Sequence, residues 1–195
     1  MKVVGLFAGI GGLEHGLAQA GHETVLLCEN WAPACAVLQS RFPDVPRHGD
    51  VRELSDLPES TEVLCAGFPC QDLSQAGKTA GLEGSRSGLV AEVFRLLEKR
   101  RAPIVVLENV PFMLHLDGGR ALQHIVNRFE SLGYKWAYRV INTLAFGLPQ
   151  RRERVFFIAA LHTDPADILL SDDMVPPKIY TRLDTHAHGF YWTEG

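Results

Sequence analysis

Short apolar segments alternate along this chain with segments whose apolar residues recur every three or four positions. The first kind, four to six residues long, is typical of buried strands, and the second is typical of amphipathic helices. The expected strands are residues 2–7, 24–28, 62–66, 104–107, 136–141 and 155–160, and the expected helices are 12–20, 32–42, 89–97 and 120–132. This alternation predicts an α/β fold with a doubly wound, mostly parallel sheet that helices cover on both faces.

The pattern and the composition predict one domain. With 195 residues and 46% hydrophobic content, the chain is long enough for one well-buried core. After Leu161 the pattern fades, and Pro165, Pro176 and Pro177 interrupt a segment without a clear period. We therefore expect a domain over residues 1–161, followed by a linker over 162–195.

Several classes of protein are disfavoured by the composition. No apolar stretch of about 18 residues and no charged-then-apolar leader occurs, so we expect a cytoplasmic protein. Cys28, Cys35, Cys65 and Cys70 lack CxxC spacing and the eight histidines form no ligand cluster, which favours free thiols over a disulfide framework or a metal site. The formal net charge is −4, so any surface that binds nucleic-acid phosphates must be local.

A cysteine directly follows one of the expected strands. Residues 67–71, with the sequence GFPCQ, come after the apolar segment 63–66, and Pro69 stiffens the turn that presents Cys70. Open α/β sheets bind ligands at the carboxyl ends of their strands, so a thiol at this point could act as a nucleophile. A lone cysteine is more often a small buried apolar residue, and the assignment depends on its neighbours.

A glycine-rich turn closes the first expected strand. Gly9, Gly11 and Gly12 form a G-x-G-G turn, which differs from the GxGxxG fingerprint of dinucleotide-binding proteins. Such a turn lets the main chain approach a ligand without a phosphate, such as S-adenosylmethionine. Glu29, at the end of the second expected strand, is placed to accept hydrogen bonds from ribose hydroxyls. An ordinary glycine turn is the alternative, because isolated glycine-rich matches are often false.

Four motifs in this order resemble the DNA (cytosine-5)-methyltransferases. They are LFAGIGG at 6–12, PCQ at 69–71, ENV at 108–110 and QRRER at 150–154, and the likeness extends over about residues 3–160. The resemblance implies a Rossmann-like methyltransferase fold. It also implies transfer of a methyl group from S-adenosylmethionine to carbon 5 of cytosine in double-stranded DNA, within a restriction-modification system.

The resemblance assigns roles to individual residues. Those assigned to catalysis are Cys70, Glu108, Arg152 and Arg154. Those assigned to the cofactor are Phe7, Ala8, Gly9, Ile10, Gly11, Gly12, Leu13, Glu29, Asn30, Trp31, Asp50, Val51, Pro69 and Leu89. Those assigned to nucleic acid are Gln71, Ser74, Lys78 and Arg86, in a polar, glycine-rich segment that could act as a lid. No metal is implied.

The chemistry of cytosine explains why Cys70 and Glu108 would act together. Addition of a thiolate to carbon 6 makes carbon 5 nucleophilic, which is covalent catalysis. Glu108 would hydrogen-bond or protonate ring nitrogen 3, while Arg152 and Arg154 would approach the base and a phosphate and favour the thiolate. The base must leave the stack for this attack. Without the other motifs, Glu108 would be a solvated strand-end acid, and the arginines a solvated charged run.

The chain departs from the family pattern in two places. Gly5 stands where the family usually has an aspartate, and nothing after Leu161 resembles a target-recognition domain. We therefore expect the catalytic half of a longer or split enzyme, with little sequence-specific activity of its own. Two alternatives remain open: a tRNA cytosine-5 methyltransferase, although the Cys-Phe-Thr element usual there is missing after Pro69, and a non-enzymatic S-adenosylmethionine-binding partner subunit.

Overall fold

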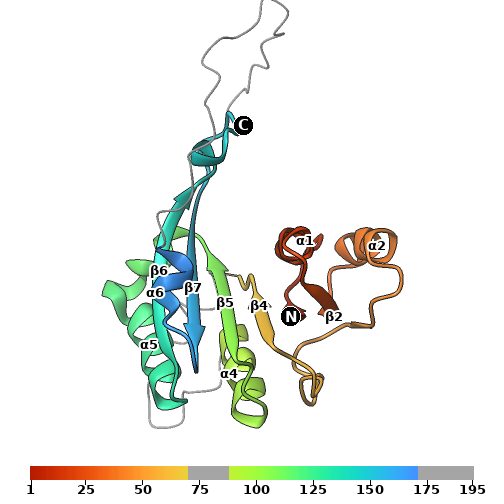
Figure 1. Cartoon of the computed structure of the whole chain (residues 1–195), viewed down its shortest axis with the longest axis horizontal. Coiled ribbons are helices and arrows are strands. Elements are labelled where there is room, and N and C mark those ends of the chain that lie inside the picture. Colours follow the sequence, from red (N-terminus) through yellow and green to blue (C-terminus); the bar gives the residue numbers. More distant parts are fainter. Residues whose placement is uncertain (70–87, 171–195) are drawn as a thin grey trace, which may run out of the picture.

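The computed structural model describes residues 1–69 and 88–170, which form one seven-stranded sheet with helices packed against it (Figure 1). The strands are β1 (Lys2–Leu6), β2 (Glu23–Cys28), β3 (Arg47–His48), β4 (Val63–Ala66), β5 (Ile104–Asn109), β6 (Lys135–Asn142) and β7 (Glu153–Ala160). Their order in the sheet is β3-β2-β1-β4-β5-β7-β6. The first five strands are parallel, and β7 pairs antiparallel with both β5 and β6. The expected mostly parallel α/β sheet is confirmed.

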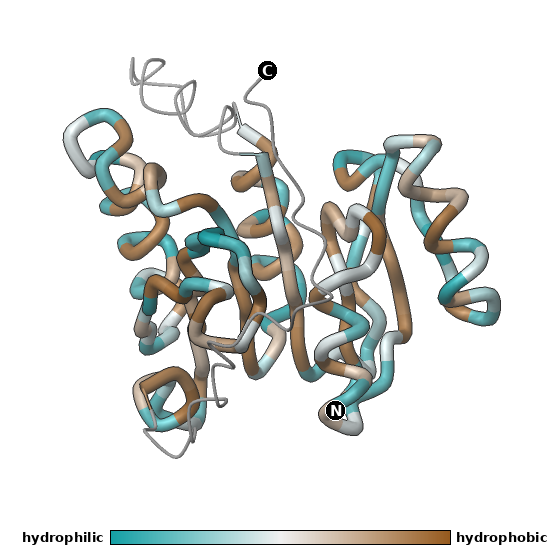
Figure 2. Tube along the Cα trace, turned by 90° about the horizontal axis from the view of Figure 1, so that it is seen from above, coloured by the Kyte–Doolittle hydropathy of each residue, from teal (hydrophilic) through white to brown (hydrophobic). Residues whose placement is uncertain are grey.

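The helices cover both faces of this sheet. They are α1 (Gly12–Gln19), α2 (Ala32–Arg41), α4 (Leu89–Lys99), α5 (Arg120–Ser131) and α6 (Pro165–Leu169), with short 3₁₀ turns η1 (Pro111–Leu114), η2 (Leu116–Gly119) and η3 (Thr143–Phe146). Alternate strand residues divide between the faces. Leu64 and Leu107 belong to the core that contains Phe94 of α4 and Phe129 of α5, whereas Val63 packs in a smaller cluster with α1. Figure 2 shows the apolar residues concentrated along the central strands.

Two strands extend at one end by two residues beyond the hydrophobic pattern. β5 includes Glu108 and Asn109 because it pairs with β7 at Glu108–Phe156 and Asn109–Val155. β7 begins at Glu153 because it pairs with β6 at Ile141–Arg154 and Asn142–Glu153. Main-chain pairing does not require apolar side chains, so the sequence pattern ended too early. The motif residues Glu108 and Arg154 consequently lie within strands rather than in loops.

The segment after Leu161 contains a helix that the sequence analysis did not predict. Asp164 caps α6 by accepting a hydrogen bond from the Ala166 N–H at 2.9 Å, and Pro165 occupies the first turn. An aspartate followed by proline is a known helix-start signal, so the sequence did contain the information. Residues 171–195 lie outside the described part of the chain.

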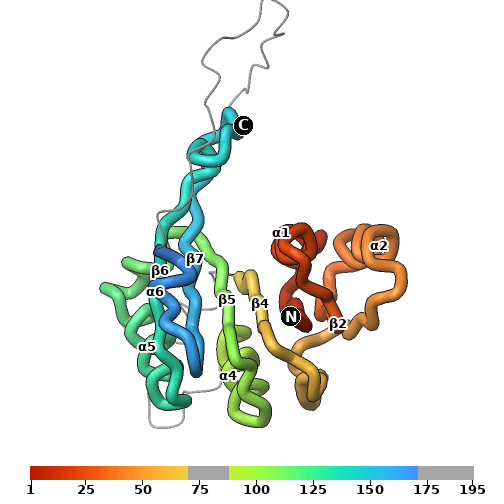
Figure 3. Tube along the Cα trace, in the orientation of Figure 1, coloured from red at the N-terminus to blue at the C-terminus, as the bar shows by residue number. Residues whose placement is uncertain are grey.

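The β6–β7 hairpin extends beyond the end of β5, as Figure 3 shows for its cyan portion. The β5 pairing stops at Val155, whereas β6 and β7 pair as far as Asn142 and Glu153. Exposed apolar side chains follow this hairpin and its tip: Tyr138, Val140, Leu144, Phe146 and Leu148. Arg154 therefore lies where the hairpin leaves the sheet.

Gly5 makes room for a buried carboxyl group. A Cβ at Gly5 would lie 2.0 Å from Glu14 Oε1, and the Glu14 side chain is only 1% exposed. The Cys65 thiol donates to Glu14 Oε1 at 3.4 Å, and burial raises the pKa of Glu14. The motif that resembles the methyltransferases usually has an aspartate at position 5. This chain has a glycine there instead, and the buried carboxyl group of Glu14 packs against it.

We predict that Glu14 makes the stability of the fold depend on pH. A carboxyl group with a raised folded-state pKa binds its proton more tightly in the folded chain, so its stabilising effect is complete below the unfolded pKa. The effect is lost as the pH rises through the folded pKa, with a slope of at most about 1.4 kcal/mol per pH unit. Glu14→Gln keeps the oxygen that accepts from Cys65 but does not ionise.

We expect the free energy of unfolding, measured by urea titration between pH 5 and pH 9, to fall with rising pH more in the wild type than in Glu14→Gln. The difference between variant and wild type should therefore grow in favour of the variant as the pH rises. The exposed Glu53→Gln is the matched control and should follow the wild type. Parallel pH profiles for Glu14→Gln and the wild type would show that Glu14 is not buried as a neutral acid.

Candidate active site

A cavity of about 260 Å³ lies at the carboxyl ends of the parallel strands. The strand order reverses between β1 and β4, and open α/β sheets bind ligands at such a switch point. The cavity is lined by Phe7, Gly9, Cys28, Glu29, Asn30, Gly49, Asp50, Val51, Gly67, Pro69 and Leu89. These residues follow four strands, β1 to β4, and begin α4, so the cavity depends on the parallel pairing of the sheet.

The loop after β1 contains three residues in the left-handed conformation, and two of them are glycines. Phe7, Gly9 and Gly11 have φ values of 53°, 54° and 81°, in the left-handed region. At Gly11 a Cβ would also lie 2.4 Å from the ring of Phe42, just after α2. The turn therefore brings the main chain of Gly9 to the cavity while Gly11 packs closely against α2.

We predict that Gly11→Ala destabilises the fold by about 1–3 kcal/mol, because it combines an unfavourable φ with a clash against Phe42. Gly16→Ala is the matched control on α1, since no atom lies within 4 Å of its new Cβ and alanine favours a helix. Chemical denaturation should show a loss for the first variant and a gain of up to about 1 kcal/mol for the second. Equal effects would contradict the packing of this loop.

Glu29 holds the loop after β1 in place. Its Oε2 accepts from the Gly9 N–H at 2.8 Å, and its Oε1 accepts from the N–H groups of Asn30 at 2.9 Å and Trp31 at 2.8 Å. Two carboxylate oxygens offer about four acceptor sites, so capacity remains for further donors. Glu29 therefore joins the ends of β1 and β2 and still presents acceptors to the cavity.

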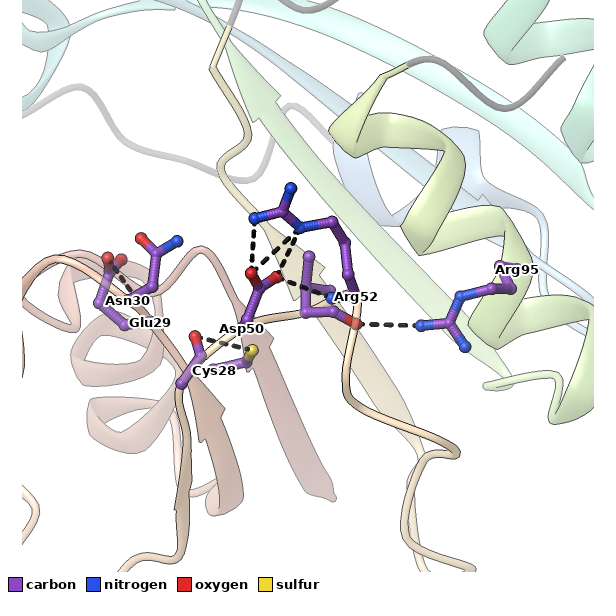
Figure 4. Close-up of polar contacts among 8 residues, drawn as sticks. Cys28, Glu29, Asn30, Asp50, Arg52 and Arg95 are labelled. Atoms are coloured by element: carbon purple, nitrogen blue, oxygen red, sulfur yellow. Dashed lines mark hydrogen bonds and ion pairs between the residues drawn. The ribbon is translucent and has the colours of Figure 1, made fainter.

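Asp50 is a second carboxylate beside the cavity, and Figure 4 shows its partners. Arg52 donates to it from Nε at 3.0 Å and from Nη2 at 2.6 Å, and these hydrogen bonds lower the pKa of Asp50 to about 2. Asp50 is therefore ionised at neutral pH. Two carboxylates in one cavity repel phosphate and favour a ligand with hydroxyl, amino or cationic groups.

The described cysteines are free thiols: Cys28, Cys35 and Cys65. Burial, with the charges of Asp50 and Glu29, raises the pKa of Cys28 to about 12, and burial raises the pKa of Cys65 well above its usual value. A neutral thiol is a poor nucleophile. Neither cysteine is therefore suited to covalent chemistry, although Cys28 lines the cavity.

Glu108 and Arg154 meet across neighbouring strands. Arg154 Nε and Glu108 Oε1 form an ion pair at 2.8 Å, and their side chains are 22% and 23% exposed. The other oxygen, Oε2, would lie 3.4 Å from a Cβ at Gly67, so the loop after β4 passes close to this carboxyl group. The antiparallel β7 is thus what brings the QRRER segment to the ENV segment.

Asn109 fixes the main chain that leads to Cys70. Its buried side chain donates from Nδ2 to the Phe68 carbonyl oxygen at 2.9 Å and accepts from the Val110 N–H at 2.8 Å. A buried side-chain hydrogen bond of this kind typically contributes about 1 kcal/mol. Asn109 therefore holds the loop two residues before the expected nucleophile.

The remaining expected site residues divide into three groups. Arg152 is exposed, and Arg151 forms only a long surface pair with Glu153, at 3.8 Å. Some expected cofactor residues lie in the same loops, or at the start of α1, but do not line the cavity: Ala8, Ile10, Gly11, Gly12, Leu13 and Trp31. Others lie outside the described residues: Cys70, Gln71, Ser74, Lys78 and Arg86.

Three residues that line the cavity were missed by the sequence analysis. They are Cys28, Gly49 and Gly67, each at the last residue of a strand or directly after one. Position at a strand end was the signal that could have found them. Within residues 1–69 and 88–170, no cluster of three or more potential metal ligands occurs, and no helix there is long and apolar enough to cross a membrane.

A family model for the C-5 cytosine-specific DNA methylases matches residues 1–186. The chain belongs to this family. Among curated relatives of this chain, the Type II methyltransferase M2.BsuMI of Bacillus subtilis (strain 168) is 48% identical over 203 residues. The alignment covers 100% of the present chain and 52% of that relative. The Type II methyltransferase M.HhaI of Haemophilus parahaemolyticus is 32% identical, over 94% of this chain and 61% of its own length.

Solved structures confirm the methyltransferase fold. The S. pombe Dnmt2 methyltransferase superimposes with a TM-score of 0.71 at 16% identity, covering 93% of this chain and 58% of that one. A putative DNA modification methyltransferase encoded within an E. coli prophage gives a TM-score of 0.68 at 23% identity, over 86% and 49%. The chain thus spans about half the length of the relatives that it matches.

Proposed function

We propose that residues 1–161 carry the methyl-donor site and the nucleophile of a DNA cytosine-5 methyltransferase of the type II modification class. Its substrate would be double-stranded DNA in the cytoplasm, and target recognition would come from a C-terminal region in the same or a second polypeptide. The observation that carries the proposal is the position of the loop 67–69. This loop lines the cavity through Gly67 and Pro69, is held by Asn109, and adjoins Glu108.

The side chains of the cavity suit S-adenosylmethionine. Glu29 and Asp50 offer acceptors for the ribose hydroxyls and for the amino group of adenine, and Phe7, Val51 and Leu89 supply apolar surface for the ring. Both carboxylates would also attract a ligand with a sulfonium and an ammonium group. When bound, this cofactor supplies the methyl group that carbon 5 of cytosine takes up.

The chain's own residues would act on the target base in two stages. The Cys70 thiolate forms a bond to carbon 6, and the electron pair of the 5,6 double bond moves to carbon 5 while Glu108 donates a proton to nitrogen 3. After carbon 5 has been methylated, it loses its proton to water and the bond to Cys70 breaks, with its electron pair going to the sulfur, which restores the 5,6 double bond. Nitrogen 3 returns its proton to Glu108 in the same stage. Arg154 would orient Glu108 through the 2.8 Å ion pair.

We predict that the chain binds S-adenosylmethionine and that Glu29 is required for this binding. Glu29→Ala removes the acceptors for the ribose and releases the loop at Gly9, so calorimetry should show an affinity at least about tenfold weaker. Glu23→Ala, at the other end of β2, is the control and should stay within about twofold of the wild type. Equal affinities for the two variants would place the donor elsewhere.

We predict methyl transfer to DNA through Cys70. The chain, combined with the C-terminal half of the M2.BsuMI relative, should incorporate tritium from labelled S-adenosylmethionine into DNA and not into tRNA, and the chain alone should incorporate little. Cys70→Ala should abolish both transfer and the denaturation-resistant complex with 5-fluorocytosine DNA. Glu108→Gln should slow transfer by about 100-fold while donor affinity stays unchanged.

Three results would contradict this function. Transfer that survives Cys70→Ala would exclude the covalent mechanism, and transfer to tRNA alone would favour an RNA substrate. Donor binding without transfer to either nucleic acid would instead favour a non-enzymatic partner subunit.

A further inference from the structure

The turn after β3 supplies Asp50 and Val51 to the cavity but receives little support from its own strand. β3 has only two residues, Arg47 and His48. Within the turn, the Glu53 N–H donates to the Asp50 carbonyl oxygen at 3.0 Å, and the Leu54 N–H donates to the Val51 carbonyl oxygen at 3.2 Å. A turn with so short a strand before it needs an external partner to hold its position.

Arg95 on α4 provides that partner. Its Nη2 donates to the carbonyl oxygens of Val51 at 3.0 Å and Leu54 at 2.8 Å, and its Nε donates to Glu92 at 2.6 Å. Figure 4 shows the hydrogen bond to Val51. The Arg95 side chain is 31% exposed and that of Glu92 is 19% exposed. Charge-assisted hydrogen bonds from a planar guanidinium fix geometry as well as adding energy.

The same helix also contributes to the cavity directly. Leu89, the first residue of α4, lines it together with Asp50 and Val51. Arg95 therefore connects two walls of the cavity, one formed by the helix and one formed by the turn. Arg52 then holds the Asp50 carboxylate on this fixed main chain.

We propose that Arg95 is a positioning residue for the donor cavity, which sets where the Asp50 carboxylate and the Val51 side chain meet the adenine ring. This inference rests on the proposed function, because it assumes that the cavity takes an adenosyl ligand. The ring of adenine carries an amino donor, which suits the Asp50 carboxylate, whereas hypoxanthine carries a carbonyl acceptor there. Correct placement of Asp50 should therefore show as selectivity between these two rings.

The test compares Arg95→Met with Lys99→Met in the 195-residue chain. Lys99 Nζ donates to the Ser55 carbonyl oxygen at 2.9 Å, so it links the same helix to the next residue after the turn, but Ser55 does not line the cavity. Calorimetry would give the Kd values of S-adenosylhomocysteine and S-inosylhomocysteine. Thermal unfolding would be recorded for each variant.

Arg95→Met should weaken binding of S-adenosylhomocysteine by about five- to tenfold and reduce its preference over S-inosylhomocysteine, since donors to two carbonyl groups are lost. Lys99→Met should leave both quantities within about twofold of the wild type. Arg95→Lys should recover part of the affinity, because an ammonium group can still donate to one carbonyl oxygen, and it replaces Arg95→Met if that variant does not fold.

A variant of Arg95 that loses thermal stability but keeps the wild-type affinity and ring preference would overturn the inference and leave an ordinary helix–loop contact. An equal loss of affinity in Lys99→Met would overturn it as well. If the wild-type chain binds neither probe at millimolar concentration, the proposed function fails and the inference fails with it. Binding of both probes without a ring preference in the wild type would leave the donor site in place and refute only the role given to Asp50 and Arg95.

Discussion

The parallel pairing of β1 with both β2 and β4 is the constraint on which the rest of the molecule depends. Parallel strands end at the same edge of a sheet, so the loops after β1, β2 and β4 meet there although they are far apart in the sequence. Glu29 then joins two of these loops by accepting hydrogen bonds from Gly9, Asn30 and Trp31. The cavity is a consequence of this meeting and of the turn after β3.

The antiparallel strand β7 positions a second group of residues, apart from the cavity. It inserts beside β5, with Glu108 opposite Phe156, and this register brings Arg154 to Glu108. A parallel sheet alone would present the carboxyl group without its arginine. The donor cavity and the Glu108–Arg154 pair thus come from different parts of the sheet, and the loop 67–69 adjoins both of them.

Two adjustments show how neighbouring positions compensate each other in this chain. The absence of a side chain at Gly5 is matched by the buried Glu14, whose oxygen fills the space beneath β1. The short strand β3 is matched by Arg95, which holds the next turn from α4. In both cases a polar side chain from a helix compensates for something the sheet lacks: a side chain at Gly5 in the first case and a longer strand β3 in the second.

The sequence by itself determined most of the strands and helices, although not β3 or α6, and it placed the motif residues at or near the strand ends. Periodic burial leaves a local pattern, and the apolar segment before Gly67 or the turn at Gly9 to Gly12 can be recognised from such patterns. It also contained the family motifs that led to Glu29, Asp50 and Glu108. Strand ends were less well predicted at Glu108 and Arg154, because main-chain pairing continues where the apolar pattern stops.

Only the tertiary structure decided that Arg154 pairs with Glu108, that Cys28 lines the cavity and that Arg95 reaches Val51. The contacts of Arg154 with Glu108 and of Arg95 with Val51 each join residues more than 40 positions apart. The partner of a side chain across a sheet is set by strand order and register, which no local pattern specifies.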